Sequence, residues 1–173
     1  MKASVFCGTS VDGFIARLNG KFDFLDHGGQ EPHGYEEFIA TVDALVMGRN
    51  TYETVLGFGG AWPFDKPVFV LSSREIQPPP AGATVEHMSG DPKDIVEQLE
   101  ARGIGHAYID GGITIQRFLR AGLIDRIIFT HVPVLIGEGI PLFGSLPHDI
   151  LLEHVATRTY KTGLVQSEYR IGK

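Results

Sequence analysis

Two strand–glycine–helix junctions constrain the fold of this chain most strongly. The first spans residues 46–55 (VMGRNTYETV), where an apolar run ends at Gly48 and a helix-like pattern begins at once. The second spans residues 109–114 (IDGGIT), again between a strand-like run and a helix-like run. Each junction leaves backbone N–H groups at a helix N-terminus, and the first adds Arg49 and the Thr51 hydroxyl, a combination that binds phosphate well. Two such junctions in 173 residues indicate a bound nucleotide cofactor.

The order of the expected elements indicates an α/β fold. Strands are expected at residues 2–9, 42–47, 67–71, 83–87 and 106–109, and helices at 35–41, 51–56, 92–102 and 113–121. Strands that alternate with helices favour a mainly parallel sheet covered on both faces. The last third is β-rich, with a long strand at 124–134 and a closing hairpin formed by 150–159 and 164–171. We therefore expect an antiparallel C-terminal edge, within a single domain over residues 1–173.

Composition excludes several classes of function. The net charge of −6 argues against general nucleic-acid binding, although local arginines can still hold an anionic ligand. With one cysteine, Cys7, no internal disulfide is possible, and its apolar surroundings indicate a core thiol. The seven histidines show no metal-ligand spacing, so no metal is expected. No apolar stretch approaches the length of a membrane span and no signal peptide is recognisable, so we expect a cytoplasmic protein with no membrane partner.

Five segments of the chain resemble those of a known family. Residues 47–53 (MGRNTYE) resemble the M-G-R-x-T-(W/Y)-E segment of the dihydrofolate reductase fold, and residues 70–74 (VLSSR) and 111–112 (GG) resemble two further cofactor segments. Residues 10–16 (SVDGFIA) and 133–143 (PVLIGEGIPLF) resemble signatures of the branch that contains the reductase domain of RibD. The segments occur in the right order over almost the whole chain. The sequence thus resembles the RibD C-terminal (riboflavin biosynthesis reductase) domain family.

This resemblance implies which fold the chain adopts and which domains it contains. The fold would be a dihydrofolate reductase-like three-layer sandwich. Bifunctional RibD proteins also carry an N-terminal zinc deaminase domain. With one cysteine and no Cys-x-x-Cys motif, that domain is not expected here, and the chain would be a stand-alone member of the family.

The resemblance also implies that the cofactor is NADPH. The residues that would hold the cofactor phosphates are Gly48, Arg49 and Thr51. Those that would flank the adenosine 2′-phosphate are Ser72, Ser73 and Arg74. The pyrophosphate would be cradled by Gly111, Gly112, Ile113 and Thr114, and the nicotinamide would lie near Gly8 and Ile15. The residues themselves agree, because two arginines beside hydroxyls suit a dianionic 2′-phosphate and so favour NADPH over NADH.

The candidate catalytic acids are Asp12 and Glu36. In the RibD branch the acid at Asp12 lies near the substrate, although Asp-Gly is equally a common turn signal. Glu36 stands on a helix expected to border the pocket, where a solvated helix face is the alternative. Dihydrofolate reductases carry an acid that contacts the pterin, but Pro32 or Gly34 aligns there, so turnover of dihydrofolate is not expected. Because no buried acid is obvious, the proton donor stays open between Asp12, Glu36 and bound water.

The sequence leaves more than one function open. The first hypothesis is an NADPH-dependent oxidoreductase that transfers a hydride to a small heterocyclic substrate, pyrimidinone- or pterin-like, acting on a CH–NH or C=O type bond. It would be similar to 5-amino-6-(5-phosphoribosylamino)uracil reductase. The alternatives are a non-catalytic nucleotide-binding module on the same fold and a flavin-binding protein. A homodimer is also expected, because the apolar strands of residues 124–171 include an edge that invites pairing and the resembled branch usually dimerises there.

Overall fold

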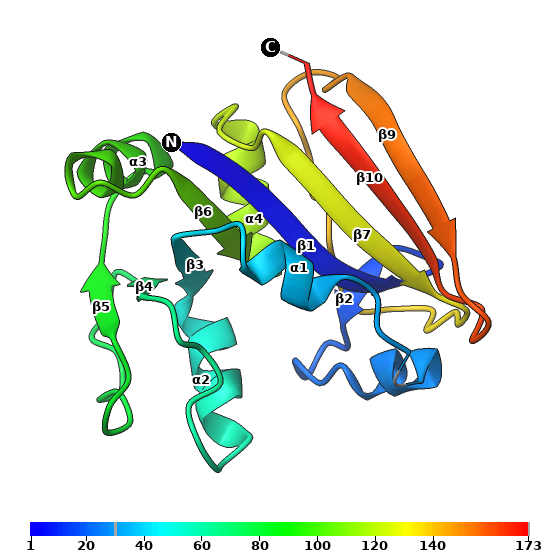
Figure 1. Ribbon diagram of the computed structural model, residues 1–173, viewed down its shortest axis with the longest axis horizontal. Helices are drawn as coiled ribbons and strands as arrows, with labels where there is room; N and C mark the ends of the chain where they lie inside the picture. The colour runs from blue at the N-terminus through cyan, green and yellow to red at the C-terminus, as the bar shows by residue number, and fades with distance from the viewer. Residues whose placement is uncertain (30, 173) are drawn as a thin grey trace.

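The computed structural model describes residues 1–29 and 31–172, in which an eight-stranded sheet forms the centre of the molecule (Figure 1). In spatial order its strands are β5 (Val85–Met88), β4 (Val68–Leu71), β3 (Ala44–Gly48), β6 (His106–Asp110), β1 (Lys2–Ser10), β7 (Arg126–Val132), β10 (Val165–Ile171) and β9 (Leu152–Thr159). All pairs from β5 to β7 are parallel. The pairs β7–β10 and β10–β9 are antiparallel. The predicted parallel sheet with an antiparallel C-terminal edge hairpin is confirmed.

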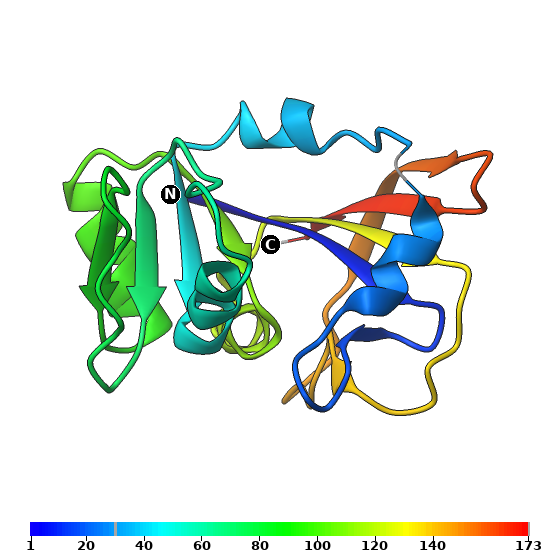
Figure 2. The same ribbon diagram turned by 90° about the horizontal axis from the view of Figure 1, so that it is seen from below.

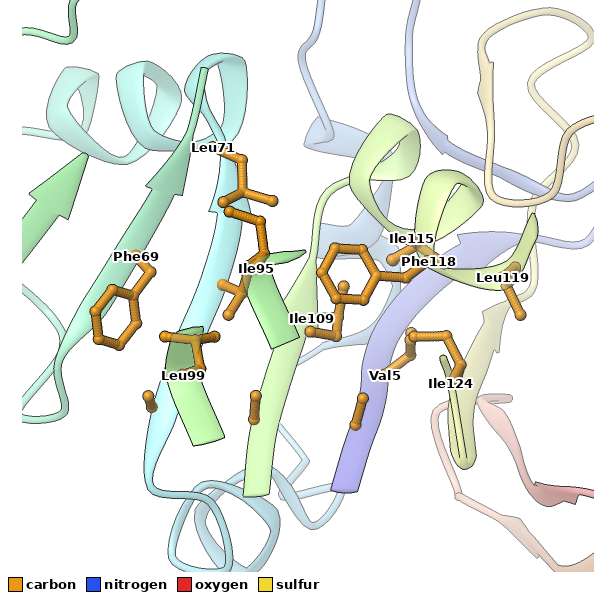
Figure 3. Close-up of a cluster of buried hydrophobic side chains, with 14 of the residues drawn as sticks. Val5, Phe69, Leu71, Ile95, Leu99, Ile109, Ile115, Phe118, Leu119 and Ile124 are labelled. Carbon is orange, nitrogen blue, oxygen red and sulfur yellow. The ribbon is translucent and has the colours of Figure 1, made fainter. Parts of the chain in front are cut away.

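Helices cover both faces of the parallel part, which gives three layers. On one face, α3 (Pro92–Ala101) and α4 (Gly112–Arg120) bury Ile95, Leu99 and Phe118 against Val5 and Ile109 (Figure 3). On the other face lie α1 (Tyr35–Ile39) and α2 (Arg49–Gly57). Their buried residues join a second core cluster with the strand side chains that point the opposite way, among them Phe38, Tyr52, Phe6, Leu45 and Met47. The continuous apolar run in β3 follows from this arrangement, because both of its faces are covered.

The helices begin and end close to where the sequence predicts. Pro92 occupies the first turn of α3, where its missing N–H costs nothing, and Gly103 follows the helix with a φ of 83°. That left-handed conformation suits glycine and stops the helix one residue before the predicted end. Helix α4 is amphipathic, because Ile115, Phe118 and Leu119 are buried in the core and Arg120 is exposed to solvent.

Two elements differ from the expected pattern. A 3₁₀ helix, η1 (Asp23–Gly28), lies between the strand predicted at 2–9 and the helix predicted at 35–41, where no helix is expected, and it buries Phe24. A short strand, β8 (Ile140–Pro141), pairs with β2 (Phe14–Ala16) in a separate two-stranded sheet. The pairing joins two of the family-like segments, which lie more than 120 residues apart in the sequence. Neither could be predicted from local pattern, because a two-residue strand exists only through its partner.

The parallel strands bring their C-terminal ends to one edge of the sheet. The ends of β1, β3, β4 and β6 are neighbours there, and α2 follows β3 while α4 follows β6 (Figure 1). In open α/β sheets this is the edge where ligands bind. Among the described residues, no helix has both the length and the apolar character that crossing a bilayer requires.

Candidate active site

A cavity of about 650 Å³ opens along the C-terminal ends of β1, β3, β4 and β6. This volume is within the range of small-molecule and cofactor sites. We call it the cleft. It brings together eleven of the residues predicted to bind the cofactor, namely Gly8, Ile15, Gly48, Arg49, Thr51, Ser72, Ser73, Gly111, Gly112, Ile113 and Thr114.

The first helix start at the cleft follows directly from the end of β3. Gly48 is the extended N-cap residue of α2, and no side chain caps the helix, so its first-turn N–H groups can serve a ligand. Arg49 Nη1 lies 2.9 Å from Glu53 Oε1 in an i,i+4 ion pair, and both side chains are 32% exposed. Since Arg49 also lines the cleft, this pair positions the guanidinium at the cleft wall without burying it.

The second helix start depends on two glycines. Gly111 has a φ of 90°, a conformation that L side chains rarely adopt, and it precedes the first turn of α4, which again lacks a side-chain cap. A Cβ atom on Gly111 would collide with the Thr51 side chain, and one on Gly48 would lie 2.9 Å from Thr114 Oγ1. The glycine of each junction therefore packs against a hydroxyl side chain of the other. The two helix starts form one continuous wall of the cleft.

Gly112 has a further constraint that the sequence did not suggest. A Cβ atom on Gly112 would lie 2.8 Å from Ile15 Cδ1 and 3.4 Å from the Pro141 carbonyl oxygen. The open side of this glycine thus faces β2 and β8. Any larger residue would disturb the small sheet as well as the cleft.

At the β4 end of the cleft, the cation among the described lining residues is Arg117 and not the predicted Arg74. Ser72 and Ser73 line the cleft, whereas Arg74 is exposed and is not among the described lining residues; its backbone N–H donates to Ser72 Oγ over 3.0 Å. Arg117 of α4 lines the cleft instead and donates to the Gly90 carbonyl over 2.9 Å. A signal for Arg117 was present in the sequence, because it stands one helical turn after Thr114 on the same side of α4.

Neither candidate catalytic acid lines the cleft among the described residues. Asp12 is exposed at the turn after β1, where its Oδ2 accepts a hydrogen bond from the Gly137 N–H over 2.8 Å. Hydrogen bonds from the Ser10 side chain and from the Gly137 and Ile136 backbone hold the pKa of this carboxyl below its usual value. Asp12 therefore ties the turn to the loop before β8, as its turn interpretation predicts. Glu36 is exposed on α1, so the placement of these two residues favours the structural alternative for both.

No buried acid is obvious in the sequence, but the structure brings a half-buried one, Asp110, to the cleft. It ends β6, lines the cleft, and accepts the Gly111 N–H on Oδ1 over 2.8 Å. Burial raises the pKa of Asp110 to about 6, and the hydrogen bond from the Gly111 N–H partly opposes this shift. A carboxyl with this pKa can carry a proton near neutral pH. The sequence held a clue, since Asp110 stands between an apolar strand and a Gly-Gly pair.

The phenol and thiol groups around Asp110 stay uncharged at neutral pH. The Tyr108 hydroxyl donates to the Phe6 carbonyl over 2.8 Å inside the sheet. Burial, and secondarily the charge of Asp110, raises the pKa of Tyr35 to about 12, so this cleft-lining phenol keeps its proton. Burial likewise raises the pKa of Cys7 far above its usual value, which fits the predicted core thiol and excludes a thiolate nucleophile. Among the carboxyl, phenol and thiol groups that line the cleft, Asp110 is thus the one that can exchange a proton near neutral pH.

Comparison with known proteins agrees with this fold. The chain belongs to the RibD C-terminal domain family, whose model matches residues 2–166. It is 30% identical to the uncharacterized protein YwjB of Bacillus subtilis over 165 residues, which cover 92% of each chain. A crystal structure from Shewanella sp. PV-4, of a protein provisionally assigned to riboflavin biosynthesis, is 39% identical and superposes with a TM-score of 0.94 over all of both chains.

The fold extends to dihydrofolate reductases. The Enterococcus faecalis dihydrofolate reductase complexed with NADP(H) matches with a TM-score of 0.62 and 19% identity, over 99% of this chain and 97% of that one. The predicted dihydrofolate reductase-like three-layer architecture is therefore confirmed, as is membership of the RibD branch.

The contact between the two helix starts can be tested by a double-mutant cycle. Gly48→Ala should lower the free energy of unfolding by about 1 kcal/mol or more, because its Cβ meets Thr114 Oγ1 at 2.9 Å while its φ of −78° tolerates alanine. Adding Thr114→Ala should recover much of that loss, giving a coupling energy of about 0.5–3 kcal/mol in urea unfolding. Additive effects of the two substitutions would show that the junctions do not restrain each other.

Proposed function

We propose that this protein is an NADPH-dependent reductase that reduces a small heterocyclic substrate by adding a hydride and a proton. The observation that carries the proposal is a single cleft bordered by two uncapped helix starts, with the proton-bearing acid Asp110 at its wall. Helix N-termini suit the cofactor phosphates, and the acid suits the proton transfer. Membership of a family named for the RibD reductase domain supports the same class of reaction.

The residues of the cleft fit a phosphorylated dinucleotide. The N–H groups at the starts of α2 and α4 would hold the pyrophosphate and neighbouring phosphates. Ser72 and Ser73 would flank the 2′-phosphate, with Arg49 and Arg117 as the nearby cations. The Ser72 N–H donates to the Met88 carbonyl, and Arg117 bonds to Gly90 two residues further on, so these groups meet at the same end of the cleft. When bound, NADPH supplies the hydride.

Asp110 would supply the proton. Its Oδ1 accepts the Gly111 N–H, which leaves the other carboxyl oxygen to carry a proton toward a substrate nitrogen or oxygen. With a pKa of about 6, it is protonated below that pH and loses the proton above it. The carboxylate left after transfer takes a new proton from water. The uncharged Tyr35 hydroxyl, which lines the same cleft, would be a second hydrogen-bond donor to the substrate.

The alternative of a non-catalytic nucleotide-binding module rested on the lack of a buried acid. Asp110 removes that reason, so we favour the enzyme. Steady-state consumption of NADPH with a panel of pterins and pyrimidinones distinguishes the two functions, because a binding module consumes none.

The proton-donor role predicts a pH dependence set by Asp110. Above about pH 6 the protonated fraction, and with it the rate of NADPH oxidation, should fall about tenfold per pH unit. Asp110→Asn should be slower by about 100-fold or more and should lack this decline. A carboxyl-carbon NMR titration of the ligand-free protein gives an independent measurement: the resonance that disappears in Asp110→Asn should titrate near 6. A resonance that titrates near 4, or an unaltered pH profile in the variant, would reject the role.

The cofactor assignment predicts a selective effect of Arg49. Arg49→Ala removes a charge-assisted contact to a phosphate and should weaken NADPH binding by roughly tenfold or more in calorimetry. Binding of NADH should change little if the guanidinium serves the 2′-phosphate. Arg120→Ala is the matched control, because Arg120 is exposed on α4 and lies outside the set of cleft-lining residues. Equal losses for NADPH and NADH would contradict the assignment of Arg49 to the 2′-phosphate.

We also propose that the chain forms a homodimer through β9. This strand pairs with β10 on one side and is the last strand of the sheet as described, and large apolar side chains are exposed beside it, namely Leu151, Leu152, Val155 and Val165. Such an edge invites a second copy. Light scattering should give about 38 kDa, twice the 18.9 kDa of one chain. Leu152→Lys should shift this mass toward the monomer and Leu18→Lys should not; a monomer in the unaltered protein would refute the dimer.

A further inference from the structure

We infer that the substrate is an uncharged, planar heterocycle that carries no phosphate group. The inference rests on the proposed reductase function and concerns the part of the cleft beyond the two helix starts. That part, which we call the aromatic chamber, is lined mainly by Phe6, Phe22, Leu25, Tyr35, Val55 and Phe58. It differs from the binding site that the sequence resemblance suggested, which would accept a phosphoribosyl compound.

Rings from separate elements form the walls of the aromatic chamber. Phe22, just before η1, meets Phe58, just after α2, edge to face with ring centroids 5.6 Å apart. Phe6 of β1 contacts the rings of Tyr35 and His33 at 5.7 and 5.8 Å. All five rings line the same cavity. Apolar and aromatic surfaces of this kind bind a flat ring by burying its faces.

The charges of the cleft do not favour a second anion. Among the described residues that line it, the guanidinium groups are Arg49 and Arg117, and both belong to the helices that would serve the cofactor. The other ionisable side chains that line the cleft are Cys7, His33, Tyr35, Tyr108 and Asp110, and no lysine is among the described lining residues. A phosphate dianion there would leave water without gaining a guanidinium or ammonium partner, which is costly.

The mouth of the aromatic chamber supplies no surplus of positive charge either. An adjoining hollow of about 310 Å³ is lined by Phe22 and Phe58 together with Lys21, Asp23 and Asp26. Arg17 Nε lies 2.7 Å from Asp23 Oδ1, so two cations and two carboxylates balance at this rim. An uncharged ring can pass this rim without an electrostatic cost, whereas a phosphate would meet carboxylates as well as Lys21.

One edge of the aromatic chamber is polar, and it defines how the ring would lie. The Asp110 carboxyl and the Tyr35 hydroxyl, both donors in their protonated forms, line the cleft with the aromatic side chains. A heterocycle with an acceptor nitrogen or oxygen on one edge would place that edge at Asp110 and its faces against the rings. Pyrimidinone and pterin rings without charged substituents have this character.

The test compares ligands that differ only in a phosphate. We would measure by calorimetry, with saturating NADP⁺ present, the binding of a ribosylaminouracil and of a hydroxymethylpterin, each with and without its terminal phosphate. The uncharged member of at least one pair should bind at least tenfold more tightly than its phosphorylated partner. Tighter binding of the phosphorylated members, or no binding by any of the four, would overturn the inference. Binding of NADPH measured alone decides the proposed function separately.

A gain of affinity gives a second, positive test. Thr54 of α2 lines both the cleft and the adjoining hollow, and Thr54→Lys would add the missing cation at a helical position that tolerates lysine. This variant should raise the affinity for the phosphorylated members about tenfold and leave the uncharged members unchanged. Gln98→Lys adds the same charge on the exposed side of α3 and should change neither. If Thr54→Lys affects both members of a pair equally, the charge of the aromatic chamber does not select the substrate.

The aromatic walls can be tested at Phe58, which is 61% exposed and therefore unimportant for folding. Phe58→Ala should weaken binding of the uncharged ring about tenfold while the dissociation constant for NADPH stays the same, and Phe58→Tyr should keep most of the affinity because it keeps the ring. Unchanged binding of the uncharged ring by Phe58→Ala would place the substrate elsewhere.

Discussion

The close approach of β3 and β6 at their C-terminal ends is the constraint on which the site depends. Gly48 and Gly111 have no side chains, so the Thr114 and Thr51 hydroxyls can occupy the space that Cβ atoms would take. These two glycine–threonine contacts hold the N-termini of α2 and α4 at one cleft, although the two helices cover opposite faces of the sheet. The parallel order of the strands brings both junctions to the same edge, and the glycines then allow them to touch.

Much of the fold could be predicted from the sequence because it depends on patterns formed by neighbouring residues. The buried runs of β3 and β4, the helix signals at Pro92 and Gly103, and the closing hairpin each involve neighbouring residues only. The 3₁₀ helix η1 and the pairing of β2 with β8 could not be predicted in the same way. Both depend on tertiary contacts, because η1 buries Phe24 and packs against β1 and β7, and β2 pairs with the distant β8.

The candidate site could be predicted where it follows the two junctions, and not where it depends on burial. The phosphate-binding geometry of a helix start is a backbone property, so Gly48, Thr51 and Gly111 were accessible to sequence reasoning. The role proposed for Asp110 depends on the burial that raises the pKa of its carboxyl, and burial is a result of tertiary packing. The same limit applies to Asp12, because its hydrogen bonds to the Gly137 and Ile136 backbone depend on a segment more than 120 residues away in the sequence.

The division of the sheet has a consequence for how such a protein can diverge. Among the described residues, those that line the cleft come from the parallel half and the segments attached to it, and none comes from β7, β9 or β10. Figure 2 shows the antiparallel strands rising to one side, away from the helices that start at the cleft. Substitutions in the outer hairpin can therefore accumulate without altering ligand contacts. In this architecture, the strand proposed to form the dimer and the residues proposed to bind ligands can evolve separately.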